Sequence, residues 1–174
     1  MKLKMRLAVA ALLTIGLSSA AAYADTITFT LTNANGSLQG APGGTLTYDA
    51  TVSASASNGA AVFLNGDSFN ITAPVTLNDS DFFSDFPLFL EPGTSFTGDL
   101  FVLTVPAGLR IGSTFLGTFT LEGGADGNAS NVLGTVDFSA VTTPEPSSIL
   151  LLMTGMAGIG WVGVKRNLRR GWAR

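Results

Sequence analysis

The sequence predicts an all-β body, an antiparallel β-sandwich of the immunoglobulin-like or jelly-roll type. The stretch from Thr26 to Thr32 alternates between threonine and an apolar residue, the period-two pattern of a strand with one buried face. Clusters of Gly, Pro and Asn, such as 42–44 and 58–59, separate the candidate strands as turn residues do. No window of the body has a convincing helical period. Many short strands with such punctuation are typical of a sandwich.

Six segments of the body carry the strand pattern, and turn clusters lie between them. The predicted strands are 26–32, 45–54, 68–72, 99–105, 113–123 and 132–142. The predicted turns are 33–36, 42–44, 58–59, 65–67, 92–93 and 123–128. We therefore expect one domain, residues 25–143, which is long enough to bury its own core.

The N-terminus has the parts of a secretory signal peptide. Three basic residues within the first six positions precede an apolar run. Ala22 and Ala24 then supply the small residues of an A-x-A cleavage site. Residues 1–24 are therefore predicted to be a signal peptide that is cleaved before Asp25, and we expect the body to be exported.

The other end of the chain predicts a transmembrane helix at about residues 147–164. This segment carries no charge, and 149–153 is strongly apolar. Eighteen helical residues with a rise of about 1.5 Å each cover about 27 Å, close to the hydrocarbon thickness of a bilayer. A buried core helix would show polar residues at helical spacing, and these are almost absent here. The pattern favours a membrane span over a core helix.

A basic tail, residues 165–174, follows the predicted helix. Its positive residues are Lys165, Arg166, Arg169, Arg170 and Arg174. A cluster of this sign next to a membrane helix stays on the cytoplasmic side and acts as a stop. We therefore expect a precursor anchored in the inner membrane, with the body exported and both basic ends in the cytoplasm.

The tripeptide Pro144-Glu145-Pro146 stands directly before the predicted helix. Its prolines fix two backbone torsions, so the tripeptide read alone is a stiff spacer. In sequence with the apolar span and the basic tail, it resembles the sorting signal of the PEP-CTERM family of exported bacterial proteins. The resemblance covers residues 144–174 and leaves the body without a named activity.

The resemblance implies partners and a destination. In that family an exosortase, a membrane-embedded cysteine transpeptidase, is thought to process the chain near the Pro-Glu-Pro motif. The family occurs in Gram-negative bacteria that make exopolysaccharide, and its members are linked to the cell envelope, the cell surface and the extracellular matrix of biofilms. The same C-terminal segment is also found on some ice-binding proteins.

The composition of the body excludes several classes of function. Residues 25–143 contain eleven acidic side chains and one basic one, Arg110, so the surface repels nucleic acid and anionic lipid. The chain has no His and no Cys, which removes disulfides, thiol nucleophiles and the Ser-His-Asp arrangement. We expect no enzymatic activity and no cofactor other than calcium.

An acidic stretch is the candidate calcium site. Asp79, Asp81 and Asp85 lie close together in the sequence, with Glu91 just beyond. Oxygen-rich loops suit calcium, which takes six to eight oxygen ligands, although the spacing lacks the glycine of an EF-hand. The alternative is a solvated acidic loop that phenylalanines hold down, and it stays open. These phenylalanines are Phe82, Phe83, Phe86 and Phe89.

A threonine row is the last candidate feature. Thr26, Thr28, Thr30 and Thr32 recur along the first predicted strand. Threonine arrays that bind ice need several regularly spaced strands, usually visible as repeats, and the sequence shows one strand without a repeat. Threonine is also simply favoured on exposed strand faces.

The leading hypothesis is a non-enzymatic, structural or adhesive protein of the cell envelope or matrix, associated with exopolysaccharide. The alternative is a calcium- or carbohydrate-binding surface module, with ice binding as a further option.

Overall fold

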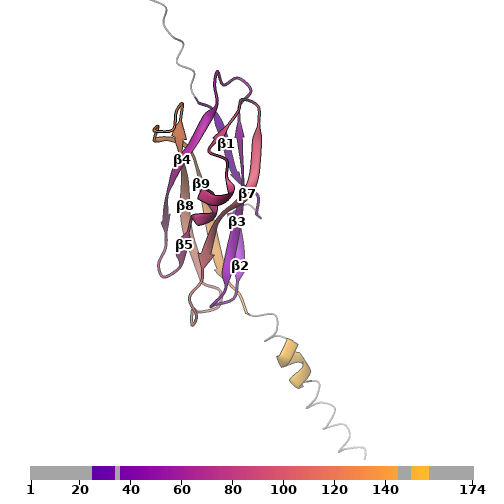
Figure 1. Cartoon of the computed structure of the whole chain (residues 1–174). Helices are drawn as coiled ribbons and strands as arrows, with labels where there is room; N and C mark the ends of the chain where they lie inside the picture. Colours follow the sequence, from indigo (N-terminus) through magenta and orange to yellow (C-terminus); the bar gives the residue numbers. More distant parts are fainter. Residues whose placement is uncertain (1–24, 34–35, 145–149, 157–174) are drawn as a thin grey trace, which may run out of the picture.

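The computed structural model describes residues 25–33, 36–144 and 150–156 of the chain. Residues 25–144 are mostly β, as the sequence predicts, and their strands form two sheets. In Figure 1 the strands form two layers, and the two ends of this body lie at opposite ends of the molecule.

The first sheet has the strand order β1-β3-β7-β5, and all its neighbours are antiparallel. Its strands are β1 (Ile27–Leu31), β3 (Thr45–Ala54), β5 (Thr76–Asn78) and β7 (Ser95–Thr104). Burial alternates along β3 from Thr45 to Ala54, with the apolar residues inside, because successive side chains of a strand point to opposite faces.

The second sheet has the order β2-β9-β8-β4-β6. Its strands are β2 (Ser37–Gly40), β4 (Val62–Ile71), β6 (Phe89–Leu90), β8 (Thr114–Gly124) and β9 (Asn131–Thr142). The prediction of an antiparallel sheet is wrong for one pair, because β2 runs parallel to β9. β1 and β2 follow each other in the sequence but pair in different sheets. The type of sandwich stays a prediction.

Most predicted strands are confirmed, with some changes at their ends. β3 has the predicted bounds, and β9 starts one residue before the predicted strand. The predicted turn at 65–67 is wrong, because β4 runs through it with a shift of register between Leu64 and Gly66. A bulge of this kind accommodates glycine within a strand, so the Asn-Gly-Asp triplet does not end the strand.

A short helix, α2 (Ser80–Asp85), corrects the expectation that the body has no helix. Its six residues are fewer than two turns, too few to show a helical period. Phe82 within the helix and Phe86, its C-cap residue, are both buried. The N–H of Phe86 donates to the carbonyl of Phe82 and closes the last turn. α2 packs against β7, where the ring of Phe86 lies 5.0 Å from that of Phe96.

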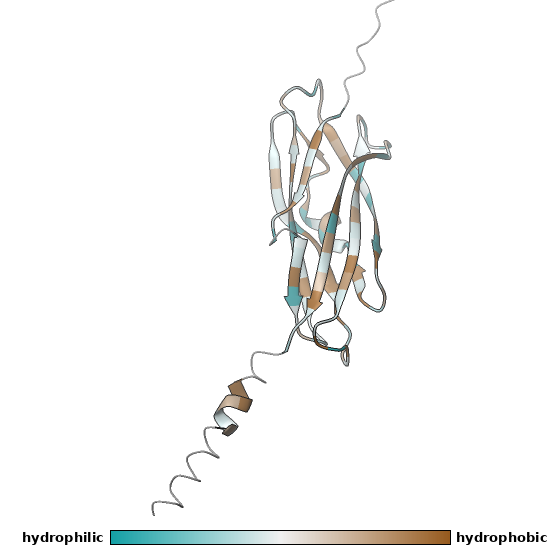
Figure 2. Ribbon diagram, turned by 180° about the vertical axis from the view of Figure 1, so that it is seen from behind, coloured by the Kyte–Doolittle hydropathy of each residue, from teal (hydrophilic) through white to brown (hydrophobic). Residues whose placement is uncertain are grey.

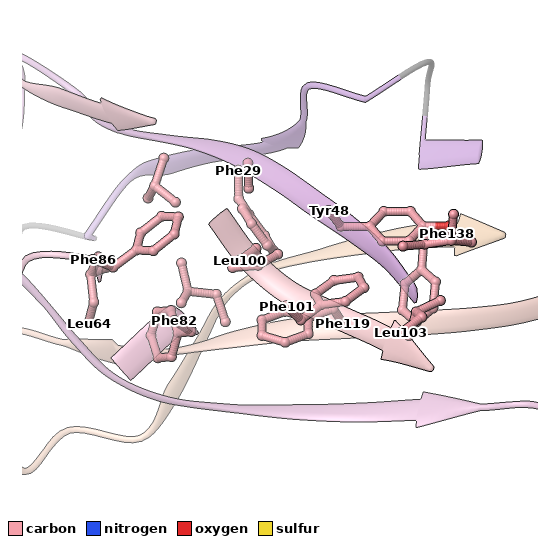
Figure 3. Packing of buried hydrophobic residues seen from close by; sticks show 14 of the residues in the cluster. Phe29, Tyr48, Leu64, Phe82, Phe86, Leu100, Phe101, Leu103, Phe119 and Phe138 are labelled. Carbon is pink, nitrogen blue, oxygen red and sulfur yellow. The ribbon is translucent and has the colours of Figure 1, made fainter. Parts of the chain in front are cut away.

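The inner faces of both sheets share one aromatic core. Phe101 of the first sheet stacks on Phe119 of the second, with ring centroids 5.2 Å apart. Tyr48 stacks on Phe101 at 4.8 Å and also contacts Phe138 of the second sheet at 5.5 Å. Figure 3 shows these rings gathered between the strands. Tyr48, Phe101 and Phe119 are completely buried, so this cluster contributes strongly to stability through apolar burial and ring geometry.

The phenol of Tyr48 joins the two sheets through a hydrogen bond. Its hydroxyl donates to the backbone carbonyl of Ser139 in β9, at 2.6 Å. A buried hydroxyl requires such a partner, because leaving it unsatisfied costs about 1–3 kcal/mol. Burial also raises the pKa of Tyr48 to about 12, which keeps the phenol protonated as the donor.

Gly117 makes room for this aromatic cluster. A Cβ at this position would lie 2.3 Å from Cζ of Phe138 and 2.8 Å from the backbone oxygen of Asn70, so the buried ring and the neighbouring strand would have to shift. β8 therefore needs glycine here so that Phe138 of the neighbouring β9 can lie flat across it. This close approach holds the ring against Tyr48 and Phe101.

Candidate functional site

The C-terminal end of β9 is held firmly in the body up to the start of the candidate sorting segment. Thr142 is buried, and its hydroxyl donates to the carbonyl of Arg110 at 2.6 Å while accepting from the Ser113 N–H at 2.9 Å. The next amide, of Thr143, donates to the carbonyl of Gly40 at 2.9 Å. Pro144 follows at once and is exposed.

Most of the predicted sorting and signal residues lie outside the described part of the chain. They are Ala22, Ala24, Glu145, Pro146, Lys165, Arg166, Arg169 and Arg170. The structure therefore places Pro144 alone of the tripeptide, directly after the last hydrogen bond of the body.

Part of the predicted transmembrane segment is described. Residues 150–156 are helical, and in Figure 2 this short helix is mostly hydrophobic. Its leucines and methionines are exposed, and Thr154 donates its hydroxyl back to the carbonyl of Leu150 at 2.9 Å. Among residues 25–33, 36–144 and 150–156, no helix has both the length and the apolar character needed to cross a membrane. The remainder of the predicted span lies outside these residues.

The acidic candidates do not gather at one point. Asp79 precedes α2, Asp81 and Asp85 belong to α2, and Glu91 follows β6. Across the described residues, no group of three or more acidic side chains is arranged to hold a metal ion. Calcium binding by these four residues stays a prediction. Of the phenylalanines expected to hold the loop down, Phe82 and Phe86 are buried, while Phe83 and Phe89 are exposed.

Asp67 is a carboxylate that the sequence interpretation missed. It lies in β4 opposite Leu121, which is completely buried, so Asp67 belongs to the inward-facing row of the strand. Both of its carboxylate oxygens are buried and have no hydrogen-bond partner in the described chain. Burial raises the pKa of Asp67 to about 6, and the charges of Asp79 and Glu122 add to the shift. The sequence pattern does not reveal this burial, because residues 65–67 resemble a turn.

A pair of carboxylates that the sequence interpretation also missed lies on the outer face of the first sheet. Asp49 of β3 and Asp99 of β7 are directly opposite each other. A hydrogen bond that protonated Asp99 donates to the Asp49 carboxylate raises the pKa of Asp99, and burial and the nearby charges of Asp49, Asp85 and Asp81 raise it further. The amide of Asn33 also donates to the Asp49 carboxylate at 3.1 Å. Three of the four candidate calcium ligands are thus divided, with the charge of Asp79 acting on Asp67 and the charges of Asp81 and Asp85 acting on Asp99.

The threonine row is broader than the sequence indicated. Thr28 and Thr30 are exposed on β1, opposite Ser53 and Thr51 of β3. Thr51 in turn lies opposite Thr97 of β7, and their hydroxyl oxygens are 2.7 Å apart. Three strands therefore contribute hydroxyls to one face, although the Asp49–Asp99 pair interrupts the pattern with charge.

Replacing Asp67 by Asn is expected to stabilise the protein by about 1 kcal/mol at pH 7.5, because the change removes an unpaired buried charge that solvent only partly screens. A carboxyl whose pKa is raised on folding contributes stability below its unfolded pKa, and this is lost as the pH rises through about 6. Urea unfolding at pH 5 and pH 7.5, in chelator, measures both effects. Asp137→Asn, which removes an exposed charge, is the control, and equal stability of the Asp67 and Asp137 variants would contradict the prediction.

Comparison with known proteins finds one match to a protein family. Residues 142–166 match the family model of the PEP-CTERM protein-sorting motif. A search of curated proteins finds no match to the chain. The matched range begins at Thr142, the last residue of β9, and contains Pro144, Glu145 and Pro146 together with the first two residues of the basic tail. The chain therefore carries a PEP-CTERM sorting motif that begins at the last strand residue of its β body.

Proposed function

We propose that this protein is a non-enzymatic component of the cell envelope or extracellular matrix, with a structural or adhesive role beside exopolysaccharide. The sorting motif implies an exported protein whose membrane-associated precursor an exosortase processes. The observation that carries the proposal is the position of the motif, which starts where the folded body ends. A cut near the motif would release the body with its core intact, since the buried apolar side chains of residues 25–33, 36–144 and 150–156 lie between Phe29 and Ala140.

The junction is suited to processing. In the described part of the chain, the amide of Thr143 is the last group bonded to the body, and Pro144 is exposed one residue later. Proline has a fixed backbone torsion and no N–H to pair with a neighbouring strand, which agrees with the end of β9 at Thr142. An enzyme at the membrane surface would meet Pro144 exposed, two residues after the last strand residue of the body.

Strand order supports an immunoglobulin-like architecture for the body. The first sheet, β1-β3-β7-β5, follows the A-B-E-D order of an immunoglobulin constant-type sheet, and β4, β8 and β9 follow the order C-F-G. β2 pairs parallel to the last strand at the edge of the second sheet. Many cell-surface domains share this sandwich architecture, so the order agrees with an adhesive or structural role without assigning a ligand.

An exposed apolar cluster also supports an adhesive role. Phe83 of α2 and Leu88 line the same small hollow and are 61% and 76% exposed. Phe89 is also exposed, and its ring lies 5.5 Å from that of Phe63. Exposed apolar groups that gather in one place mark surfaces that contact other molecules.

The Glu145→Gln variant tests the sorting function. The change keeps the size of the side chain, both prolines and the apolar span, so a simple spacer tolerates it. An enzyme that pairs the carboxylate in its own site discriminates against glutamine, because its polar group is then left unsatisfied. We expect the wild-type protein to leave the inner membrane and to lose the mass of the segment after the motif.

The variant should stay in the membrane at nearly full length, lacking only the signal peptide. Fractionation followed by intact-mass spectrometry measures both forms, and a strain without exosortase is the control. Equal processing of wild type and variant would reduce the motif to a linker.

The second candidate function is binding of calcium, and the unpartnered carboxylate of Asp67 beside Asp79 favours it. A cation there would supply the missing partner and would stabilise the native state by mass action. Under this candidate, the melting temperature is higher in calcium than in chelator, and replacing Asp67 and Asp79 together by Asn removes the difference. Identical melting in calcium and in chelator would leave the acidic residues as a solvated surface.

A further inference from the structure

A hollow lies on the solvent face of the second sheet. It has a volume of about 490 Å³ and is lined by Asn70, Leu116, Gly117, Thr118, Asp137 and Phe138. This volume is within the range of about 300–1,000 Å³ that is usual for sites that bind small molecules. The lining comes from three neighbouring strands, β4, β8 and β9, so the rigid part of the sheet rather than a loop shapes it.

The strand register places three polar residues in one row across this hollow. Asn70 of β4 lies opposite Thr118 of β8, which lies opposite Asp137 of β9. All three side chains are exposed. Because strands are about 4.8 Å apart, the row presents an amide, a hydroxyl and a carboxylate over a length of about 10 Å. Leu116, which is 63% exposed, adds an apolar surface beside the row.

The polar groups of this row have no internal partners, in contrast to those of the next row. One step along the strands, Thr120 and Thr135 have hydroxyl oxygens 3.1 Å apart, and Ser68 donates to the carboxylate of Glu122 at 2.9 Å. Within residues 25–33, 36–144 and 150–156, the side chains of the three row residues make no hydrogen bond. They are therefore free to bond a ligand without breaking a contact of the fold.

The chemistry of the row selects the class of ligand. An amide and a hydroxyl both donate and accept hydrogen bonds, and a carboxylate accepts them, which matches the hydroxyl groups of a sugar ring. An anionic ligand is disfavoured, because Asp137 lies in the row and the body has eleven acidic side chains against one basic one. Leu116 offers an apolar contact for the C–H face of such a ring.

We propose that this hollow binds neutral sugar residues of a glycan chain, with Asn70, Thr118 and Asp137 as the hydrogen-bonding groups. The proposal deepens the matrix role proposed above and rests on it for the source of the glycan. The polysaccharide would contact the outer face of the second sheet. The hydroxyl-rich outer face of the first sheet would not take part in this binding.

Native affinity electrophoresis of residues 25–143, which contain the complete core, tests the proposal. The gels contain hydroxyethylcellulose, laminarin, dextran or galactomannan as neutral polymers, and alginate as the anionic one. We expect at least one neutral polymer to retard the domain and alginate to have no effect. Thr118→Val and Asp137→Asn should each weaken the retardation about fivefold, as the loss of one hydrogen bond does.

A variant in the neighbouring row is the matched control. Thr135→Val also removes one exposed hydroxyl from the same face, and it should bind as the wild type does, while melting curves check that every variant is folded. Three results would overturn the proposal: no retardation in any neutral gel, unchanged binding by both row variants, or stronger retardation in alginate. Processing of the precursor is measured separately, so the two proposals can fail independently. Loss of glycan binding with normal sorting would contradict only this site. Failed sorting with intact glycan binding would contradict only the proposed delivery.

Discussion

The arrangement of the body depends on the buried phenol of Tyr48. Its ring comes from β3 in the first sheet, and its hydroxyl reaches the carbonyl of Ser139 in β9 of the second. The bond is made inside an aromatic cluster, where solvent cannot compete, so it fixes the position of β9 relative to the opposite sheet. Three residues after Ser139, the same strand places Thr142, where the match to the sorting motif begins, in its buried hydrogen bonds, and Pro144 is exposed two residues later.

This packing leaves the outer faces of the two sheets as the surfaces that a ligand could reach. Rings of the first sheet meet rings of the second at centroid distances of 4.8–6.2 Å, so side chains fill the space between the sheets. The chemistry that remains lies on the outer faces, and the two faces differ. The first sheet presents hydroxyls interrupted by the Asp49–Asp99 pair, whereas the second presents the unpaired row that crosses its hollow. Under the proposal made above, the body would bind an extended ligand on an outer face rather than enclose a small one between the sheets.

How much could be predicted from the sequence differs between the strands and the sites. β3 was predicted to the residue because its burial alternates without interruption, whereas the Asn-Gly-Asp triplet concealed the middle of β4. The helix α2 and the short β5 and β6 are too brief to carry a period. The sorting motif could be predicted because its residues are consecutive, and the family match confirms it. The sequence could not predict that Asp67 lies beside Asp79, or that one row joins Asn70 to Asp137. In both cases the fold brings together residues that are distant in the sequence.

Titration of Tyr48 by near-ultraviolet absorbance tests the central claim most directly. Residues 25–143 contain this tyrosine alone and no tryptophan, so the tyrosinate signal reports one group. A phenol buried between the sheets and bonded to Ser139 should stay protonated beyond its ordinary pKa of about 10 and ionise only near pH 12. Because the pKa is raised on folding, the contribution of Tyr48 to stability should be constant below pH 10 and fall as the pH rises toward 12, so that ionisation and unfolding occur together. Reversible ionisation near pH 10 in a domain that stays folded would show that Tyr48 is accessible to solvent and does not join the two sheets.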